Sequence, residues 1–93
     1  MHVTFDSAKD AVNLTKHRVS LLDAAGLEWD AALLWPDKRR DYGEPRMIGL
    51  VPLIDRLFCV VFVDRPPGKP TERRVISLRK ANSREVKRYA DND

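Results

Sequence analysis

Three short segments of this sequence hold side chains that could do acid–base or electrostatic chemistry. The first is Lys16-His17, an ammonium group beside an imidazole. The second is Glu44-Pro-Arg46, with a carboxylate and a guanidinium two residues apart, and the third is the arginine-rich stretch that ends at Arg79. An imidazole titrates near neutral pH and suits proton transfer, whereas guanidinium groups bind anions such as phosphate. The sequence therefore indicates proton transfer beside an anion-binding surface.

Each of these segments also has an interpretation without chemistry. Lys16 and His17 can form the solvated end of a helix, where cations oppose the helix dipole favourably, and spacing alone favours this interpretation. Glu44 and Arg46 can pair with each other as a surface ion pair, which their spacing also favours. Arg79 can belong to a charged strand edge. Against that, it is followed by a helix N-terminus, whose N–H groups attract anions such as phosphate.

Positive charge is concentrated in the last third of the chain. Residues 65–93 hold 9 Lys and Arg against 4 Asp and Glu, whereas residues 1–64 hold 8 against 10. The formal net charge of +3 is therefore an average over an uneven chain. Such a concentration of positive charge indicates a polyanionic partner, most simply nucleic acid.

Length and composition exclude several classes of protein. With 93 residues, 43% of them hydrophobic, we expect one domain over residues 1–93 with a thin core. No apolar run approaches the roughly 20 residues of a membrane helix, and the first residues do not form a signal-peptide pattern. We therefore expect a cytoplasmic protein without a membrane partner.

The single cysteine and the two histidines give no metal or redox pattern. Cys59 lies in an apolar run and is expected to be a buried, inert thiol in a reducing compartment. His2 and His17 are fifteen residues apart, and no paired Cys/His spacing occurs. We expect neither a metal nor another cofactor, so any catalysis would rest on acid–base groups and charge.

The predicted fold is α+β, with one antiparallel sheet packed with N-terminal helices and a C-terminal helix in the order β-α-α-β-β-β-α. Residues 31–35 can either extend the second helix or begin a strand. Pro52 places its strand at a sheet edge or a bulge. The predicted strands are 2–5, 46–54, 57–63 and 72–79, and the predicted helices are 7–17, 21–29 and the segment from the Asn82 cap to about Tyr89.

Periodicity predicts the buried face of the first helix. Ala8, Ala11 and Val12 follow a helical spacing and form a small apolar face. Asn13 and His17 fall on the opposite, polar face. We therefore expect the apolar face to pack on the sheet and the polar face to meet solvent or a ligand.

Alternation predicts the faces of the last strand. Ile76 and Leu78 fall on one face, which we expect to be the core face. Arg73, Ser77 and Arg79 fall on the other face and point away from the core.

The spacing of these residues resembles the BrnT family of type II toxin–antitoxin toxins, which are small ribonucleases with a RelE-like fold. Each motif is weak alone, but together they are specific and extend from Phe5 to Tyr89. The family usually has Gly after the Lys-His pair, where this chain has Arg18. The residues that carry the resemblance are Phe5-Asp6, Lys9, Asn13, Lys16-His17, Val19-Ser20, Ala24, Asp41, Gly43-Glu44, Arg46, Gly49, Val60-Val61, Arg65, Arg74 to Ala81, Glu85 and Tyr89.

This resemblance implies a metal-independent endoribonuclease in which the 2′-hydroxyl of RNA attacks the adjacent phosphorus. Glu44 and His17 are then expected to supply the base and the acid, in either order. Arg46, Arg79 and Lys16 are expected to bind the phosphate. The further RNA contacts expected are Arg74, Ser77, Lys80 and Tyr89.

The resemblance also implies partners. RNA is the expected substrate, and a BrnA-type antitoxin is expected to neutralise the toxin, with operator DNA bound only through their complex. The charge pattern leaves a second interpretation open, a non-catalytic module of the same fold that binds nucleic acid or the antitoxin. Both interpretations require the same basic surface, so composition does not separate them.

Overall fold

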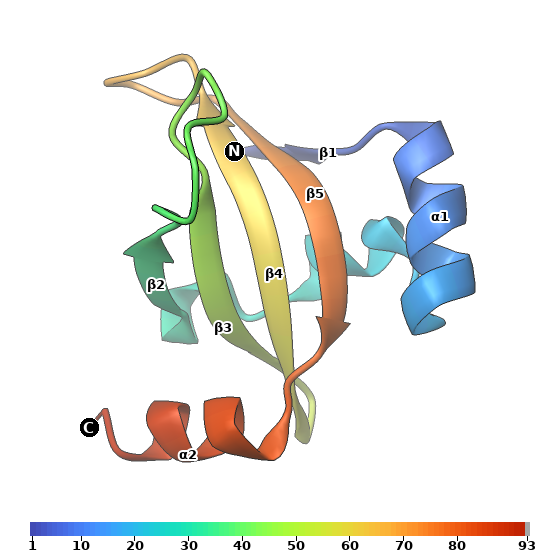
Figure 1. Ribbon diagram of the computed structural model, residues 1–93, viewed down its shortest axis with the longest axis vertical. Helices are drawn as coiled ribbons and strands as arrows, with labels where there is room; N and C mark the ends of the chain where they lie inside the picture. The colour runs from blue at the N-terminus through green and yellow to red at the C-terminus, as the bar shows by residue number, and fades with distance from the viewer. Residues whose placement is uncertain (93) are drawn as a thin grey trace.

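A five-stranded mixed sheet forms the body of the protein (Figure 1). This computed structural model describes residues 1–92, and the strand order is β1-β5-β4-β3-β2. β1 runs parallel to β5, and the other neighbouring strands are antiparallel. The strands are β1 (His2–Thr4), β2 (Leu33–Pro36), β3 (Met47–Leu53), β4 (Arg56–Arg65) and β5 (Glu72–Lys80).

Two α-helices and two short 3-10 helices complete the fold. α1 (Ser7–His17) lies beside β5, and α2 (Ser83–Ala90) crosses the end of the sheet (Figure 1). η1 (Leu21–Gly26) and η2 (Trp29–Ala31) are 3-10 helices that lie behind the sheet in this view. The fold is α+β as predicted, but the second helix is 3-10 and the sheet is mixed where it was predicted antiparallel. Of the two alternatives for residues 31–35, the strand is the one that forms, so β2 is added to the predicted order.

The hydrophobic core lies between the sheet and η1. Leu21, Ala24 and Leu27 are spaced three residues apart and are all buried. A 3-10 helix has three residues per turn, so this spacing aligns the three side chains on one side of η1, where an α-helix would rotate them apart. Their partners across the core are Val51, Phe58, Val60, Phe62, Val75 and Leu78.

β4 is the central strand, as its continuous apolar run predicts. Phe58, Cys59 and Val60 are consecutive and all buried, so both faces of the strand are covered there.

The predicted asparagine cap of α2 is also confirmed. The Asn82 side chain accepts from the Glu85 N–H, and the Glu85 carboxylate accepts from the Asn82 N–H.

The strand that contains Pro52 is internal and pairs with β4 without a bulge, so both predicted alternatives, a sheet edge and a bulge, are wrong. β3 lies between β4 and β2, but its pairing with β2 ends at Leu50 opposite Leu33. Pro52 lies beyond that pairing, where the missing N–H of proline breaks no ladder bond. A short neighbouring strand therefore allows proline in an internal strand.

Helix α1 packs on the sheet with its polar face, opposite to the prediction. Asn13 is 5% exposed, whereas Val12 is 65% exposed. The Asn13 amide donates to the carbonyl oxygens of Val19 (2.8 Å) and Leu78 (2.7 Å) and accepts from the Leu78 N–H (3.1 Å). An amide can satisfy these buried backbone groups and an alkyl side chain cannot, so hydrogen bonding decides which face turns inward.

A β-bulge in β5 changes the predicted alternation. Val61 pairs with Ser77 and Phe62 pairs with Val75, so Ile76 is an extra residue without a partner. Val75 is therefore in the core, and Ile76 lines a groove on the other face together with Ser77. The prediction that Ile76 faces the core is wrong because alternation across a bulge fails by one residue.

Because of the same bulge, Arg73 lies on the core face, although alternation predicted it on the outer face. Its guanidinium lies over the rings of Trp29 (4.5 Å) and Phe62 (4.4 Å) and forms a bidentate pair with Asp64 at 2.8 Å. Arg73 thus seals the end of the core by stacking and ion pairing. Ser77 and Arg79 remain on the outer face, as predicted.

Candidate active site

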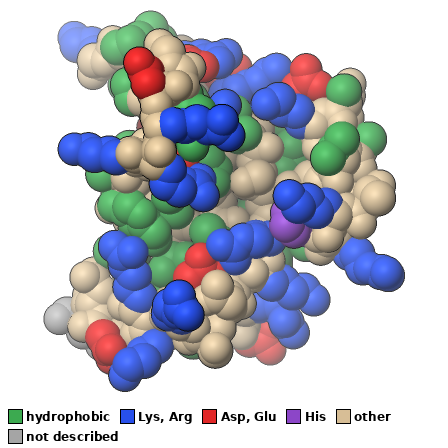
Figure 2. Space-filling model, viewed as in Figure 1, with side chains coloured by type: hydrophobic (Ala, Val, Ile, Leu, Met, Phe, Trp, Pro, Cys, Tyr) green, Lys and Arg blue, Asp and Glu red, His purple; other side chains and the backbone are tan. Residues whose placement is uncertain are grey.

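The outer face of the sheet, away from η1, carries a pocket of about 350 Å³. Figure 2 shows Lys and Arg side chains gathered around this face, over α1, the loop between β2 and β3, and α2. We call it the basic pocket. It unites four predicted residues, Lys16, His17, Ser77 and Arg79, with side chains from five other parts of the chain. The full lining is Lys16, His17, Trp35, Arg39, Ile48, Cys59, Val61, Ser77, Arg79 and Glu85.

His17 enters the basic pocket from the last turn of α1 and is half-buried. Partial burial, and then the charges of Lys16 and Arg79, lower its pKa below the ordinary value of 6.5. The imidazole is therefore mainly neutral at pH 7 and can accept a proton. Its neighbours are cations that would also bind an anionic substrate next to it.

The position of His17 depends on how α1 ends. Arg18 follows it with φ 59°, in the left-handed region, and the Arg18 N–H donates to the Leu14 carbonyl (2.8 Å). Glycine is the residue that adopts this conformation without steric cost. Arg18 thus makes the turn expected of glycine there, and the helix end that presents His17 is retained.

Arg79 is held at the pocket wall by Glu85. Its two terminal nitrogens each donate to one oxygen of the Glu85 carboxylate at 2.8 Å. This pairing lowers the pKa of Glu85 to about 2, against burial, which acts in the opposite direction. Because Glu85 also caps α2, one carboxylate connects the guanidinium to the start of that helix. Glu85 is a fixed counter-charge at physiological pH and not a proton donor.

Cys59 forms part of the pocket floor. Its thiol is buried, and this burial raises its pKa to about 11. The sequence suggested no cationic neighbour, but Arg79 lies opposite it on β5, and its charge opposes the shift only in part. The thiol therefore stays protonated, and the prediction that it is buried is confirmed.

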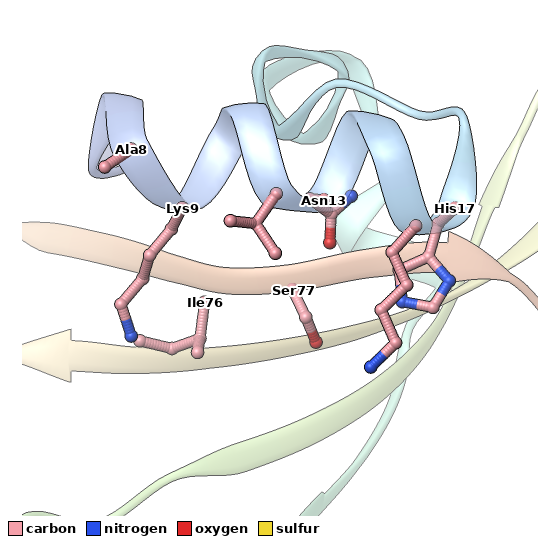
Figure 3. A pocket seen from close by; sticks show the side chains of 8 residues that line it. Ala8, Lys9, Asn13, His17, Ile76 and Ser77 are labelled. Atoms are coloured by element: carbon pink, nitrogen blue, oxygen red, sulfur yellow. The ribbon is translucent and has the colours of Figure 1, made fainter.

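A second hollow of about 360 Å³ extends the basic pocket between α1 and β5 (Figure 3). It shares Lys16, His17 and Ser77 with the basic pocket. Figure 3 shows Lys9 and Ile76 toward one end of this α1–β5 groove and His17 at the other end. The two hollows therefore form one continuous path with His17 in the middle.

Glu44 and Arg46 lie in the loop between β2 and β3 and are not among the residues that line the basic pocket. The predicted ion pair between them is wrong. The Glu44 carboxylate instead pairs with Arg65 (2.6 Å), and that pairing lowers its pKa. Arg46 stacks over the ring of Tyr42, 4.0 Å from its centroid.

The remaining predicted RNA contacts are dispersed around the sheet. Arg74 is half-buried on β5, near the β1 edge. Lys80 is exposed at the end of β5 and does not line the basic pocket. The Tyr89 hydroxyl donates to the carbonyl oxygen of Ala31 (2.6 Å), so it ties α2 to η2.

A family model for the ribonuclease toxin BrnT of type II toxin–antitoxin systems matches residues 5–85 of the 93. The chain belongs to the BrnT family. Among curated proteins, none matches the sequence. The matched segment includes every residue that lines the basic pocket, whereas Tyr89 lies beyond it.

Two pocket residues of this BrnT-family protein were not predicted as functional. Arg39 was not singled out, although an Asp-x-Arg spacing after a strand is short enough for the Asp37–Arg39 pair that forms (2.7 Å). Glu85 was named only among the residues that carry the family resemblance, without a role in the site. Its second partner, Arg79, is six residues away and becomes a neighbour only when β5 meets α2.

Within residues 1–92, no three His, Cys, Asp or Glu side chains are grouped so that they could hold a metal ion. In the same residues, no helix has the length and apolar character to cross a membrane.

Proposed function

We propose that the basic pocket cleaves RNA, with His17 accepting the proton of a 2′-hydroxyl and with Lys16 and Arg79 stabilising the phosphate. The observation that carries this proposal is a neutral imidazole that shares one pocket with several cations. A positioned base contributes on the order of 10²–10⁴-fold to such a reaction. Electrostatic donors aimed at the developing charge contribute on the order of 10²–10³-fold each.

The reaction needs no metal ion. The 2′-oxygen forms a bond to phosphorus while the bond from phosphorus to the 5′-oxygen breaks. The products are a 2′,3′-cyclic phosphate and a free 5′-hydroxyl. The proton taken up by His17 can return to the 5′-oxygen, so one titrating group serves both steps. Glu44 lies outside the basic pocket, and its lowered pKa suits it to the role of base only, so it is the alternative to His17 for the first step alone.

The RNA strand would lie along the continuous path formed by the α1–β5 groove and the basic pocket. Ser77 lines both parts and can donate a hydrogen bond to a phosphate oxygen. Arg46 and Arg74 would bind flanking phosphates at the margins of the face. Lys80 and Tyr89 would contact nucleotides near α2, and Tyr89 would do so with its ring, since its hydroxyl donates to the carbonyl of Ala31.

We further infer a RelE-like fold and the partners that accompany it in this family. An antiparallel sheet core with α1 beside it and α2 across its end supports the fold (Figure 1). A BrnA-type antitoxin would cover the basic face and thereby exclude RNA, and operator DNA would be bound by the complex. The site of action would be the cytoplasm.

Cleavage of a short RNA by the purified protein in excess EDTA tests this proposal. The wild-type protein and His17→Gln are compared, with His2→Gln as the matched control because His2 is exposed on β1, remote from the pocket. We expect wild type and His2→Gln to give fragments with 2′,3′-cyclic phosphate ends, and His17→Gln to be slower by about 10²-fold or more.

The other outcomes are equally clear. Cleavage that EDTA abolishes would contradict the metal-independent mechanism, and equal rates for the three proteins would remove His17 from it. If the folded wild-type protein binds RNA and leaves it intact, the chain is a non-catalytic binding module.

A further inference from the structure

Arg39 presents a guanidinium to the basic pocket from the loop between β2 and β3. Its Nε donates to Asp37 Oδ1 at 2.8 Å, and its Nη2 donates to Asp37 Oδ2 at 2.7 Å. The Asp37 side chain is 0% exposed, whereas the Arg39 side chain is 68% exposed. A carboxylate buried in a surface loop therefore holds an arginine whose outer side faces the pocket opening.

The Asp37 carboxylate is unusually well fixed. Besides the two guanidinium bonds, it accepts from the Arg39 backbone N–H (3.2 Å) and from the Tyr42 hydroxyl (3.2 Å). The Asp37 N–H donates to the carbonyl of Arg46 (2.8 Å), which closes the loop. The hydrogen bond from Arg39 holds the pKa of Asp37 far below its usual range, although burial acts in the opposite direction. Asp37 is thus a permanent anion that keeps Arg39 in one place.

The pairing leaves Arg39 with hydrogen-bond capacity. A guanidinium has five N–H donors, and the fork to Asp37 uses two of them. Three donors remain for a ligand. Arg79 is held differently: its two terminal nitrogens pair with Glu85, and Nη1 also donates to the Lys80 carbonyl (3.3 Å), so Nε–H and one N–H of Nη2 remain for a ligand. His17 lines the same pocket as both arginines.

The charge of the pocket selects its ligand. Arg39, Arg79 and Lys16 are cations, whereas Glu85 is its anionic lining residue within the part of the chain that the structure describes. Two planar guanidinium groups in a pocket of net positive charge match the oxygens of a phosphodiester better than a single ammonium group would. Burial of the Asp37 carboxylate would cost stability if it were not paired with Arg39. Its presence therefore indicates that the orientation of the Arg39 guanidinium matters.

We propose that Arg39 is a further catalytic residue of this pocket, which binds a non-bridging oxygen of the scissile phosphate opposite Arg79, while Asp37 and Tyr42 position it. This inference deepens the proposed function and rests on it for the identity of the substrate. It assigns Asp37 no direct contact with RNA.

The test compares Arg39→Gln with Arg40→Gln. Arg40 is the next residue of the same exposed loop and is not among the residues that line the basic pocket. We expect Arg39→Gln to lower kcat/KM for RNA cleavage by about 10²-fold, and Arg40→Gln to stay within about threefold of wild type. Arg39→Lys should recover little, because an ammonium cannot form the fork to Asp37 and reach the phosphate together.

A second measurement separates positioning from folding. In Asp37→Asn the neutral amide is a weaker partner for the guanidinium, so we expect kcat to fall with a smaller change in KM. We also expect the NMR chemical shift of the Arg39 Nε–H to move toward that of a free arginine side chain. Tyr42→Phe should show the same pattern more weakly. Thermal melting of each variant establishes that it is folded. Equal kcat/KM for folded Arg39→Gln and Arg40→Gln would overturn the proposal.

Failure of the proposed function gives a different result. If the wild-type protein cleaves no RNA, binding of a 2′-O-methyl oligonucleotide, which the proposed reaction cannot cleave, still decides the role of Arg39. Weaker binding of Arg39→Gln than of Arg40→Gln, by about tenfold, would support a phosphate ligand in a binding module. Equal binding would overturn the inference independently of catalysis.

Discussion

The immediate surroundings of His17 suit the role of base that we propose for it. It is partly buried, and it shares the pocket with Lys16 and Arg79, whose charges disfavour its protonated form. The same cations that attract a phosphate therefore keep the imidazole neutral before the phosphate arrives. A bound phosphate would reverse that effect and raise the affinity of His17 for a proton, which is the direction that proton abstraction requires.

Replacement of Lys16 by Gln should therefore move the pH profile. Without the Lys16 charge, the pKa of His17 rises, so the acidic limb of kcat/KM moves to higher pH, because activity requires the neutral base and is lost as pH falls through its pKa. An NMR titration of His17 should show the same rise. Lys9→Gln, seven residues earlier on α1, should leave this midpoint unchanged, because Lys9 is not among the charges that lower the pKa of His17. A midpoint that stays fixed in Lys16→Gln would contradict the assignment of the limb to His17.

Asn13 should prove to be one of the most sensitive single positions for stability. Asn13→Ala leaves the Leu78 N–H and the carbonyls of Val19 and Leu78 without their buried partner, and we expect a loss of about 3 kcal/mol in the free energy of unfolding. Urea denaturation measures it. Thr15→Ala, on the exposed side of the same helix, should cost less than about 0.5 kcal/mol. A small loss in Asn13→Ala would show that water replaces the amide.

At the scale of the secondary-structure elements, the end of α1 carries strain that a substitution can relieve. Arg18 has φ 59°, a conformation that costs a non-glycine residue about 1–2 kcal/mol. Arg18→Gly should therefore raise the free energy of unfolding by roughly 0.5–1 kcal/mol, after the greater freedom of glycine in the unfolded chain is subtracted. Arg18→Ala keeps the strained backbone and should show no such gain. If both variants stabilise equally, the charge of Arg18 is responsible and the backbone is not.

The elements also show how far sequence reasoning reaches. The apolar run around Val60 predicts the central strand correctly, because burial on both faces leaves a continuous apolar pattern. The inward face of α1 was predicted wrongly, because a hydrophobic pattern contains no information about the backbone groups that Asn13 satisfies. The bulge at Ile76 is likewise absent from the local pattern, because it is a property of the pairing between two strands.

At the scale of the whole molecule, the basic pocket collects residues from α1, from the strands β2 to β5, from the loop between β2 and β3, and from α2. Arg79 was predicted as a phosphate ligand from local charge and position, and Lys16 and Ser77 were predicted as RNA contacts from the family resemblance; the fold does bring the three together with His17. The predicted site omitted Arg39, because its neighbours in the pocket become apparent only after the loop between β2 and β3 folds over the sheet. Charge counts therefore predict that a polyanion binds, whereas the set of side chains that would surround it can be identified only from the tertiary structure.

Binding of RNA to this surface should depend on salt in proportion to the number of phosphates it contacts. If Lys9, Lys16, Arg39 and Arg79 each contact one phosphate, the slope of log K against log salt is about −2.8 for a single strand, and affinity falls about 50-fold between 50 and 200 mM. Fluorescence anisotropy with a 2′-O-methyl oligonucleotide measures this slope. Arg39→Gln should reduce its magnitude by about 0.7. Lys87→Gln should leave it unchanged, because Lys87 is exposed and pairs with Asp91 on α2. A slope shallower than −1 would mean that fewer than two phosphates are contacted, which is too few for a strand that follows both the α1–β5 groove and the basic pocket.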